Sequence, residues 1–480
     1  MRTALLSLLS VLVAAPARAQ APPPSADVPA EAPALEGELV VDLNDRLTDA
    51  QVAELGRRYD VQILPVSSYS HRHRIYRMQV RAAAADRRAL VARILAALRR
   101  DRAVEAADPA LIYQIPETAP GSLTRDEPVG LPARVEGAER GFPNDPKYKY
   151  QWHLDQIRMP RAWPQAQGQG VIVAVVDTGV TQVEDLRGTE MVPGWNFIDN
   201  TADARDDHGH GTHVAGTIAQ TTHNGIGVAG VAYKARIMPI KVLSAQGSGS
   251  VAAIAEGVRW AVDHGAQVIN MSLGGRLYSQ VLAAAVQYAY DRGVVVVCAA
   301  GNDGRGKVSY PAANRGAIAV AATQFDETTT FYSNWGREIS VAAPGGNTRL
   351  DQNGDGLPDG VLQNTVVPGD PSRQDYLLFM GTSMAAPHVA GVAALIIGAG
   401  VKDPAQVRRI LERSARRPNQ LKATRDDHYG YGIVDAEAAV RAAQAATQDR
   451  GEGSLALSLG LLLLGGVAMR RASRASLHPL

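Results

Sequence analysis

The chain has 480 residues, more than one ordinary domain needs, and its 46% hydrophobic and 20% charged residues form a globular composition. The formal net charge of +1 gives no reason to expect a nucleic-acid partner. Cys298 is the only cysteine, which excludes an intrachain disulfide. If the protein is secreted, another element must stabilise the fold, and bound calcium is the candidate.

The first 19 residues have the features of a secretory signal peptide. Arg2 supplies a positive start, residues 5–15 an apolar stretch, and Ala17-Arg18-Ala19 a small-x-small cleavage site. A buried N-terminal helix is the alternative, and the segment 1–19 is too short and wrongly flanked for a membrane span. We therefore expect a secreted, extracellular protein, with a Pro/Ala-rich linker at residues 20–36.

Residues 37–115 have the pattern of a small α+β domain. A helix is predicted at residues 48–59, because Thr48 and Gln51 have the spacing of a capping box. The order strand, helix, strand, strand, helix, strand is typical of a two-layer ferredoxin-like domain. The expected strands are residues 39–43, 61–66, 75–80 and 104–112, and the second helix is residues 86–99. A linker that contains Pro and Gly follows at residues 116–142.

Residues 143–448 alternate between strand and helix patterns. Residues 171–176 are almost wholly apolar, as a strand buried on both faces is. Such alternation predicts an α/β domain with a doubly wound parallel sheet. The other expected strands are residues 235–242, 267–271, 294–299 and 317–321, and the expected helices are residues 211–220, 251–264 and 278–292. Asp403 and Asp435 are expected to cap two later helices.

The last segment, residues 449–480, is a glycine-led hydrophobic tail. An apolar run from Leu455 to Met469 precedes Arg470 and Arg471. The run is shorter than the ~20 residues that a spanning helix usually needs, and the two arginines would stay on the cytoplasmic side. The arrangement is similar to the sorting tails of secreted bacterial proteins, which are held in the membrane and often cleaved. A permanent single-span anchor is the alternative, so the tail predicts membrane or cell-envelope attachment, either transient or lasting.

Three segments carry residue types that nucleophilic catalysis needs together. Asp177 follows the buried strand 171–176, at the carboxyl edge where open α/β sheets place their sites. His210 lies at the start of a helix, and Ser383 lies in a turn of small residues that leads into another helix. A serine hydroxyl needs a histidine to take its proton, and that imidazole needs a carboxylate to hold its tautomer. A helix start also offers N–H groups to a developing oxyanion.

These segments resemble the subtilisin family of serine peptidases, whose triad follows the chain order Asp, His, Ser. The resemblance covers residues 143–448 and implies a serine endopeptidase that hydrolyses peptide bonds in proteins through an acyl-enzyme intermediate. It makes Ser383 the nucleophile, His210 the general base and Asp177 the orienting acid. Asn302 resembles the family's oxyanion-hole asparagine, and a role as a simple turn residue is the alternative.

Three other interpretations compete with this one. His210 and His213 have the spacing of a zinc site, but no Glu lies between them as in a zinc-peptidase helix. The segment Asp177-Thr178-Gly179 alone would suit an aspartic peptidase, but that class needs a second catalytic Asp, and the sequence has no other Asp-Thr-Gly. An inactive relative that only binds protein is disfavoured because every catalytic position is filled.

The resemblance also implies a substrate groove between a strand and a facing loop. A peptide held between two such backbone edges is bound through its main chain, with pockets for alternate side chains. The expected partners are therefore protein or peptide substrates of broad sequence, without nucleic acid and without an organic cofactor, and we expect a monomer. The implied substrate-binding residues are Ser272, Leu273, Gly274, Gly247, Ser248 and Gly249.

Residues 37–115 resemble the inhibitory propeptide of the same family by position and strand order. In that role the domain would help the chain fold, inhibit the catalytic domain of the same chain and be removed on activation. The protein would then be made as a zymogen, and the mature start would lie in the linker before Pro143.

Calcium in a structural role is the cofactor that the resemblance implies. Asp145, Asp185 and Asn224 stand where related enzymes place side-chain ligands. A second candidate is the loop 351–359, where oxygen-bearing residues alternate around a glycine as in the early part of an EF-hand loop. Its candidate ligands are Asp351, Asn353, Asp355 and Asp359. Leu362 replaces the closing Glu, and a solvated Asp/Gly turn without metal is the alternative.

Overall fold

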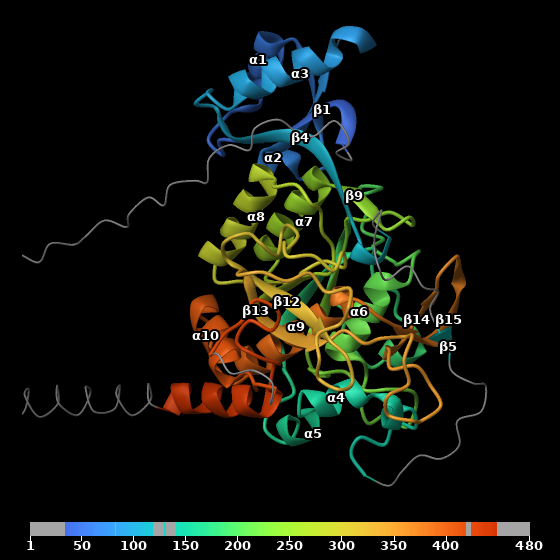
Figure 1. Cartoon of the computed structure of the whole chain (residues 1–480). Helices are drawn as coiled ribbons and strands as arrows, with labels where there is room; N and C mark the ends of the chain where they lie inside the picture. Colours follow the sequence, from blue (N-terminus) through green and yellow to red (C-terminus); the bar gives the residue numbers. More distant parts are fainter. Residues whose placement is uncertain (1–33, 82, 119–128, 131–140, 419–423, 449–480) are drawn as a thin grey trace, which may run out of the picture. The chain divides into compact units, whose positions relative to one another are not determined.

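The computed structural model describes residues 34–81, 83–118, 129–130, 141–418 and 424–448 (Figure 1). The predicted signal peptide and the predicted hydrophobic tail lie outside the described residues, as do most residues of the two predicted linkers. Within the described ranges, no helix is both long enough and apolar enough to cross a membrane.

The N-terminal part is an antiparallel sheet with two helices packed on one face. Its strand order, β2-β3-β1-β4, is the ferredoxin-like arrangement that the element order predicts. The predicted capping box is present, because Thr48 Oγ1 accepts the N–H of Gln51 and Gln51 Oε1 accepts the N–H of Thr48. The elements are β1 (Ala34–Leu43), α1 (Asp49–Tyr59), β2 (Val61–Pro65), α2 (Ser70–His73), β3 (Ile75–Val80), α3 (Ala84–Leu98) and β4 (Val104–Gln114).

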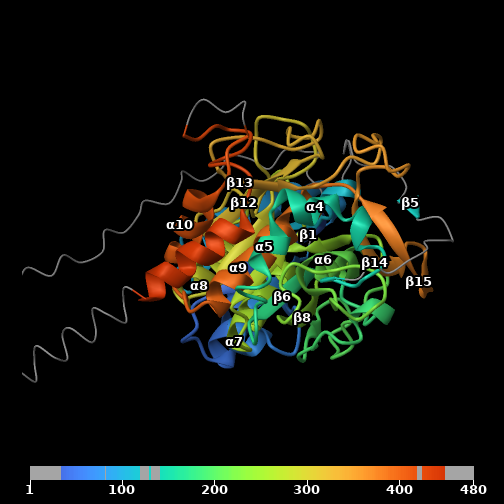
Figure 2. The ribbon, with the colours of Figure 1, turned by 90° about the horizontal axis from the view of Figure 1, so that it is seen from below.

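The larger part is built on a seven-stranded parallel sheet of order β13-β12-β11-β10-β6-β8-β7. Helices cover both faces, which confirms the predicted doubly wound α/β domain (Figures 1 and 2). Along β6, Val173 and Val175 belong to the core formed with α6 and α9, whereas Ala174 and Val176 belong to the core formed with α7 and α8. The strands are β6 (Ile172–Asp177), β7 (Trp195–Asn196), β8 (Arg236–Lys241), β10 (Val268–Met271), β11 (Val295–Ala299), β12 (Ala317–Thr323) and β13 (Ile339–Pro344). The helices that cover them are α6 (His210–Ala219), α7 (Val251–Asp263), α8 (Gln280–Asp291) and α9 (Thr382–Gly398).

A hairpin that the sequence pattern did not predict precedes α9. It consists of β14 (Val361–Val367) and β15 (Asp370–Phe379), and β5 (Val129–Gly130) pairs with β15. Its strands lack the alternation that marks a half-buried strand, because residues 361–366 are all buried and residues 371–375 are all exposed. The remaining elements are η1 (Pro116–Thr118), η2 (Tyr148–Tyr150), α4 (Trp152–Gln156), α5 (Met159–Ala162), η3 (Glu184–Leu186), β9 (Ser248–Ser250) and α10 (Pro404–Ser414).

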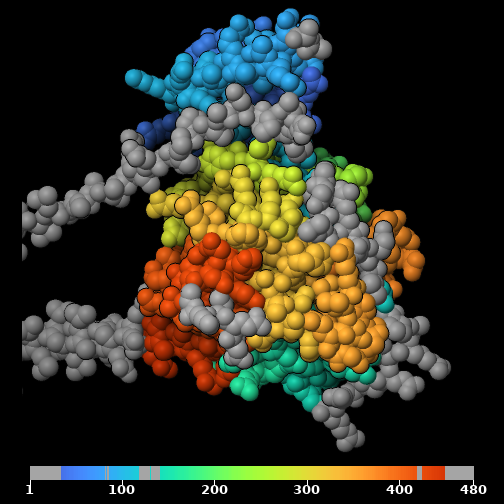
Figure 3. Space-filling model, viewed as in Figure 1, coloured from blue at the N-terminus to red at the C-terminus, as the bar shows by residue number. Residues whose placement is uncertain are grey.

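The N-terminal sheet packs on helices α7 and α8 of the larger part (Figures 1 and 3). Arg259 Nη2 donates a hydrogen bond of 2.5 Å to Asp42 Oδ2, and both side chains are buried. Asp108 Oδ2 accepts the hydroxyl of Ser279 at 2.7 Å and the N–H of Val281 at 2.9 Å, so the N-terminal part supplies a cap to helix α8. From this anchored position β4 runs on to pair with β9 of the larger part.

Candidate active site

Asp177 and His210 meet at the carboxyl end of β6. Asp177 is the last residue of β6 and is fully buried, and its Oδ1 accepts the N–H of Thr178 at 2.7 Å. His210 is the first residue of α6, and its Nδ1 lies 2.7 Å from the same Oδ1. The strand end and the helix start therefore bring the predicted acid and the predicted base into direct hydrogen-bond contact. With the proton on Nδ1, the imidazole presents Nε2 to the rest of the site.

The electrostatic setting of His210 favours its charged form. Burial alone would lower the pKa of the imidazole, but the carboxylates of Asp177 and Glu117 outweigh burial and raise the pKa of His210 from 6.5 to about 10. Glu117 Oε2 lies 3.6 Å from His210 Nε2, so the ring stands between two carboxylates.

The start of helix α6 is held by Asp206, a residue that the sequence analysis did not single out. Asp206 Oδ1 accepts the hydroxyl of Thr178 at 2.8 Å and the N–H groups of His208 and Gly209 at 2.9 and 3.0 Å. Its Oδ2 accepts both the N–H and the hydroxyl of Thr212, at 2.9 and 2.7 Å. One buried carboxylate thus ties the end of β6 to the helix that carries His210.

Ser383 and Asn302 meet at the start of helix α9. Asn302 Oδ1 accepts the N–H and the hydroxyl of Thr382, at 2.9 and 2.7 Å. This pair of bonds fixes the orientation of the amide, so that Nδ2 points to the same place as Ser383 Oγ. Thr382 was not predicted to have a role, because its contact with Asn302 joins residues 80 positions apart.

A carboxylate from outside the larger part occupies this place. Ser383 Oγ donates to Glu117 Oε2 at 2.9 Å, and Asn302 Nδ2 donates to Glu117 Oε1 at 3.0 Å. Glu117 Oε2 therefore lies between Ser383 Oγ and His210 Nε2, the two atoms that a serine peptidase joins by a hydrogen bond. Glu117 falls in the predicted linker, and nothing in the sequence around it signals this position.

The predicted substrate-binding residues form two backbone edges, with β4 between them. Gln114 exchanges hydrogen bonds of 3.1 and 2.8 Å with Gly274, and the N–H of Ile115 donates to Gly247 O at 2.9 Å. On the side of Gly247, strand β9, which contains Ser248 and Gly249, pairs antiparallel with residues 112–114. The other two predicted residues, Ser272 and Leu273, are fully buried. Ser272 Oγ donates to Ser383 O at 2.8 Å and so links the strand edge to the start of α9.

The other histidines near the site have structural contacts. His213 Nε2 faces the carbonyl oxygens of Val361 and Leu377 at 3.0 and 3.2 Å, and its ring stacks on Phe379. Burial, with the charge of His210 adding to it, lowers the pKa of His213 to about 3. His213 therefore packs under the hairpin, so its Nε2 is committed to carbonyl oxygens and not to a zinc ion shared with His210.

Two of the three residues of the first predicted calcium site are deeply buried beside the loop 222–228. Asn224 Nδ2 donates to Asp185 Oδ1 at 2.8 Å, and the N–H of Asn224 donates to Asp145 Oδ1 at 3.1 Å. Asp145 and Asp185 are 4% and 0% exposed. Burial, with the charge of Asp145 adding to it, raises the pKa of Asp185 to about 7. The structure thus brings Asp145, Asp185 and Asn224 together.

The second predicted calcium site is a tight loop stabilised by its own side chains. Asp351 accepts the N–H groups of Gly354 and Gly356, at 2.8 and 3.1 Å. Asn353 Nδ2 donates to Asp355 Oδ2 at 3.0 Å. Asp359 is 1% exposed, and its Oδ1 is buried without a hydrogen-bond partner among the described residues.

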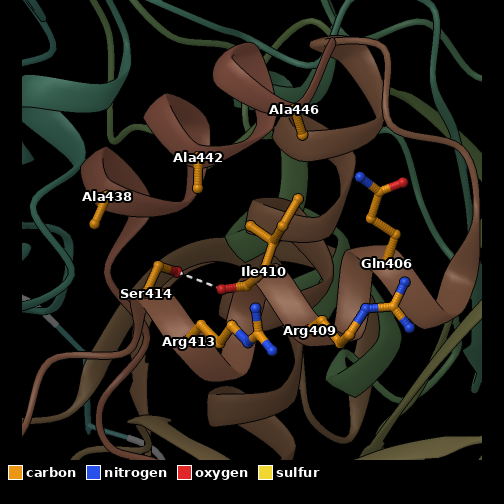
Figure 4. A pocket seen from close by; sticks show the side chains of 8 residues that line it. All are labelled: Gln406, Arg409, Ile410, Arg413, Ser414, Ala438, Ala442 and Ala446. Carbon is orange, nitrogen blue, oxygen red and sulfur yellow. Dashed lines mark hydrogen bonds between the residues drawn. The ribbon is translucent and has the colours of Figure 1, made fainter. Parts of the chain in front are cut away.

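Two further observations concern metal binding and a hollow that lies away from the predicted catalytic residues. No group of three or more His, Cys, Asp or Glu side chains in the described ranges is arranged to hold a metal ion by itself. A hollow of about 450 Å³ lies between α10 and the helical residues 436–448, lined by alanines on one side and by Arg409 and Arg413 on the other (Figure 4). These elements contribute none of the predicted catalytic residues.

Comparison with known proteins points to the same chemistry. The model of the subtilase family, Peptidase_S8, matches residues 168–432. Thermitase from Thermoactinomyces vulgaris is 39% identical over 301 residues, which cover 62% of this chain and 99% of thermitase. Subtilisin Savinase from Lederbergia lenta is 41% identical over 295 residues, which cover 60% of this chain and 98% of Savinase.

Solved structures of proteases also match this chain. A protease from Pseudoalteromonas arctica PAMC 21717 is 39% identical with a TM-score of 0.58, and the match covers 63% of this chain and 100% of that one. Fervidolysin from Fervidobacterium pennivorans, described as a keratinolytic enzyme related to subtilisin, is 26% identical with a TM-score of 0.67. The match with fervidolysin covers 86% of this chain and 62% of that one, so it extends beyond the part that the first structure matches.

Proposed function

Because the chain belongs to the subtilase family and is a serine endopeptidase of the subtilisin type, we propose that Asp177, His210 and Ser383 form its catalytic triad and that Asn302 completes the oxyanion hole. The observation that carries this proposal is the convergence of His210 Nε2, Ser383 Oγ and Asn302 Nδ2 on one carboxylate, that of Glu117. The three groups come from widely separated segments of the chain, yet all three contact the two carboxylate oxygens of Glu117.

The proposed reaction follows from these positions once a peptide carbonyl replaces the Glu117 carboxylate. Ser383 Oγ attacks the carbonyl carbon while His210 Nε2 takes the hydroxyl proton, and Asp177 stabilises the imidazolium that results. The carbonyl oxygen becomes an oxyanion that accepts hydrogen bonds from Asn302 Nδ2 and from the N–H of Ser383 at the start of α9. His210 then gives its proton to the leaving amine, and water later releases the acyl group by the same steps in reverse order.

Treatment of the mature enzyme with a serine-directed phosphonyl reagent would test this assignment. Covalent labelling at Ser383, together with casein hydrolysis that is lost in Ser383→Ala, is the expected result. Casein hydrolysis that survives Ser383→Ala would exclude the assignment.

The same proposal includes a substrate groove that takes an extended peptide. The contacts of Gln114 and Ile115 with Gly274 and Gly247 support it, because an inserted strand already forms main-chain hydrogen bonds to both edges. Main-chain binding makes protein and peptide substrates of varied sequence the proposed partners.

We also propose that the protein is a secreted zymogen. The N-terminal domain, residues 37–115, would act as the inhibitory propeptide, a role supported by its docking on α7 and α8 and by the insertion of β4 at the groove. The similarity to fervidolysin, which extends beyond the catalytic part, also supports this role. Secretion rests on the signal-peptide features of residues 1–19, and envelope attachment on the tail 449–480.

Structural calcium is proposed at the two predicted places. The first site fits a hard cation, because the buried carboxylates of Asp145 and Asp185 and the amide of Asn224 lie together, and Ca²⁺ prefers such oxygen ligands. The second site fits less completely: Asp359 Oδ1 is buried and unpartnered, but Asp351, Asn353 and Asp355 bond within the loop. A calcium ion would supply charge compensation and rigidity at either place.

Chelation separates the two calcium proposals. EDTA should lower the melting temperature of the mature enzyme by about 5–10 °C if a tightly bound ion is lost. Asp185→Asn should abolish most of that shift, and Asp351→Asn should abolish only the part that belongs to the loop. Asp291→Asn, an exposed change on α8, is the matched control. An unchanged melting curve after confirmed metal removal would contradict both sites.

A further inference from the structure

The position of Glu117 is not explained by an ordinary strand in the substrate groove. Residues 112–115 are extended and bonded to both edges, but Pro116, Glu117 and Thr118 then form one turn of 3-10 helix. Proline has no N–H to continue the main-chain ladder. The backbone thus leaves the extended path just before the catalytic groups, and this segment reaches Ser383 Oγ with the side chain of Glu117.

We infer that the Glu117 side chain is a built-in plug of the catalytic centre, a carboxylate that occupies the oxyanion site and keeps the uncut precursor inactive. This inference rests on the proposed function, because it takes Ser383 as the nucleophile. It adds a specific inhibitory residue, outside the predicted propeptide 37–115, to the general expectation of an inhibitory domain.

The contacts of the carboxylate account for inhibition at each catalytic group. Glu117 Oε2 accepts the hydroxyl hydrogen of Ser383 at 2.9 Å, which turns the nucleophile's proton away from the base. Glu117 Oε1 accepts from Asn302 Nδ2 at 3.0 Å, which fills the place of the developing oxyanion. Gly381 leaves the room for this oxygen, because a Cβ at Gly381 would overlap Glu117 Oε1.

The plug also acts on the general base. Glu117 Oε2 lies 3.6 Å from His210 Nε2, and its negative charge favours the imidazolium form of the ring. A protonated imidazole cannot take a proton from Ser383. A carboxylate anion also offers no leaving group that a serine could displace, so the contact is stable against the enzyme's own chemistry.

The plug has a consequence for maturation. Because the described residues 113–118 reach Ser383 Oγ with the Glu117 side chain and not with a main-chain carbonyl, the first cut within them does not occur in this arrangement. It requires Glu117 to leave the site, after which the precursor either cuts itself or is cut by another molecule.

The test uses freshly folded full-length precursor and the rate at which a phosphonyl reagent labels Ser383 before any cleavage. Glu117→Ala should label about tenfold faster than the unchanged chain or more, since a charged hydrogen bond to the nucleophile is lost. Glu117→Gln should be intermediate, because the amide keeps the shape without the charge. Glu54→Gln is the matched control: Glu54 is an exposed acid on α1 that pairs with Arg57 and lies in the same domain.

Each outcome bears on the plug. Faster labelling and faster maturation of both Glu117 variants, with the control unchanged, supports it. Labelling of Glu117→Ala at the rate of the control overturns it, and so does slower maturation with unchanged labelling, which would make Glu117 part of the cleaved sequence. Melting curves of the same changes in a Ser383→Ala background establish that the variants fold. Failure of the proposed function looks different, because then the fully matured enzyme also fails to label.

Discussion

The two halves of the proposed catalytic centre are organised in different ways. Asp177 and His210 bond directly to each other at 2.7 Å, and Asp206 holds the helix start that carries His210. Ser383 Oγ and Asn302 Nδ2 instead converge on Glu117, which belongs to a segment before the catalytic part. The first half is set by one strand and one helix of the larger part, so it should persist when the N-terminal segment leaves. The second half is arranged around the carboxylate of Glu117, here called the guest carboxylate because it comes from outside the larger part. This carboxylate marks where a transition-state oxyanion would be bound.

The largest expected effect, on kcat, comes from a change in the first half, the Asp177–His210 pair. Asp177→Asn keeps the size of the side chain but removes the charge that stabilises the imidazolium, so kcat of the mature enzyme should fall about 10⁴-fold. Steady-state hydrolysis of a chromogenic peptide measures the loss. A kcat within tenfold of the unchanged enzyme would show that the pair at 2.7 Å is not the acid–base pair of the reaction.

A change in the second half, at Asn302, should reduce kcat less than the loss of the Asp177 charge does. Asn302→Ala removes one oxyanion donor, and kcat should fall roughly 10²–10³-fold with little change in KM, a loss known for the corresponding position in subtilisin, a member of this family. Thr382→Val is the matched lesser change, because it removes one of the two donors that orient the Asn302 amide and leaves the main-chain donor in place. A large rise in KM at unchanged kcat would make Asn302 a ground-state contact.

Much of the fold could be predicted from local sequence, and so could the candidate residues for the two halves of the proposed site. Buried strands such as β11 are apolar runs, and α1 begins at a capping box, so both lie within a residue or two of the predicted bounds. Asp177, His210 and Ser383 lie in motifs that need no structure to find. Asp206 and Glu117 could not be predicted, because each acts through contacts that depend on the folded chain. Asp206 precedes α6 beside a second acid, Asp207, and the sequence does not say which of the two caps the helix.

Asp206 gives the next prediction, an effect on stability. Asp206→Ala leaves the hydroxyl of Thr178 and several buried N–H groups without their acceptor, so the free energy of unfolding of the mature enzyme should fall by about 3 kcal/mol. Denaturant titration of the matured enzyme in a phosphonylated, inactive form measures it. Asp203→Ala removes only exposed bonds to the side chain and the main-chain N–H of Arg205, so it should change the same quantity by less than about 0.5 kcal/mol. Equal losses in both variants would contradict a special role for Asp206.

The smallest expected effect is a change in the titration of His210, and it tests whether the two halves are coupled. The pKa of His210 in the precursor is raised to about 10, with Asp177 and Glu117 both contributing. A histidine whose pKa is raised stabilises the closed precursor fully below its ordinary value of 6.5, and that stabilisation is lost as the pH rises through about 10. The contact of Glu117 with the charged ring should therefore hold at neutral pH and weaken in alkali.

Nuclear magnetic resonance of the ring nitrogens measures this titration in a Ser383→Ala precursor, which cannot process itself. Adding Glu117→Gln should lower the midpoint of His210, because one of the two carboxylates that stabilise the imidazolium is removed while Asp177 remains. Glu54→Gln in the same background should leave the midpoint in place. If the midpoint is the same with and without the Glu117 charge, Asp177 alone sets the charge of the base. The guest carboxylate would then act on Ser383 and Asn302 only, and the two halves of the site would be independent.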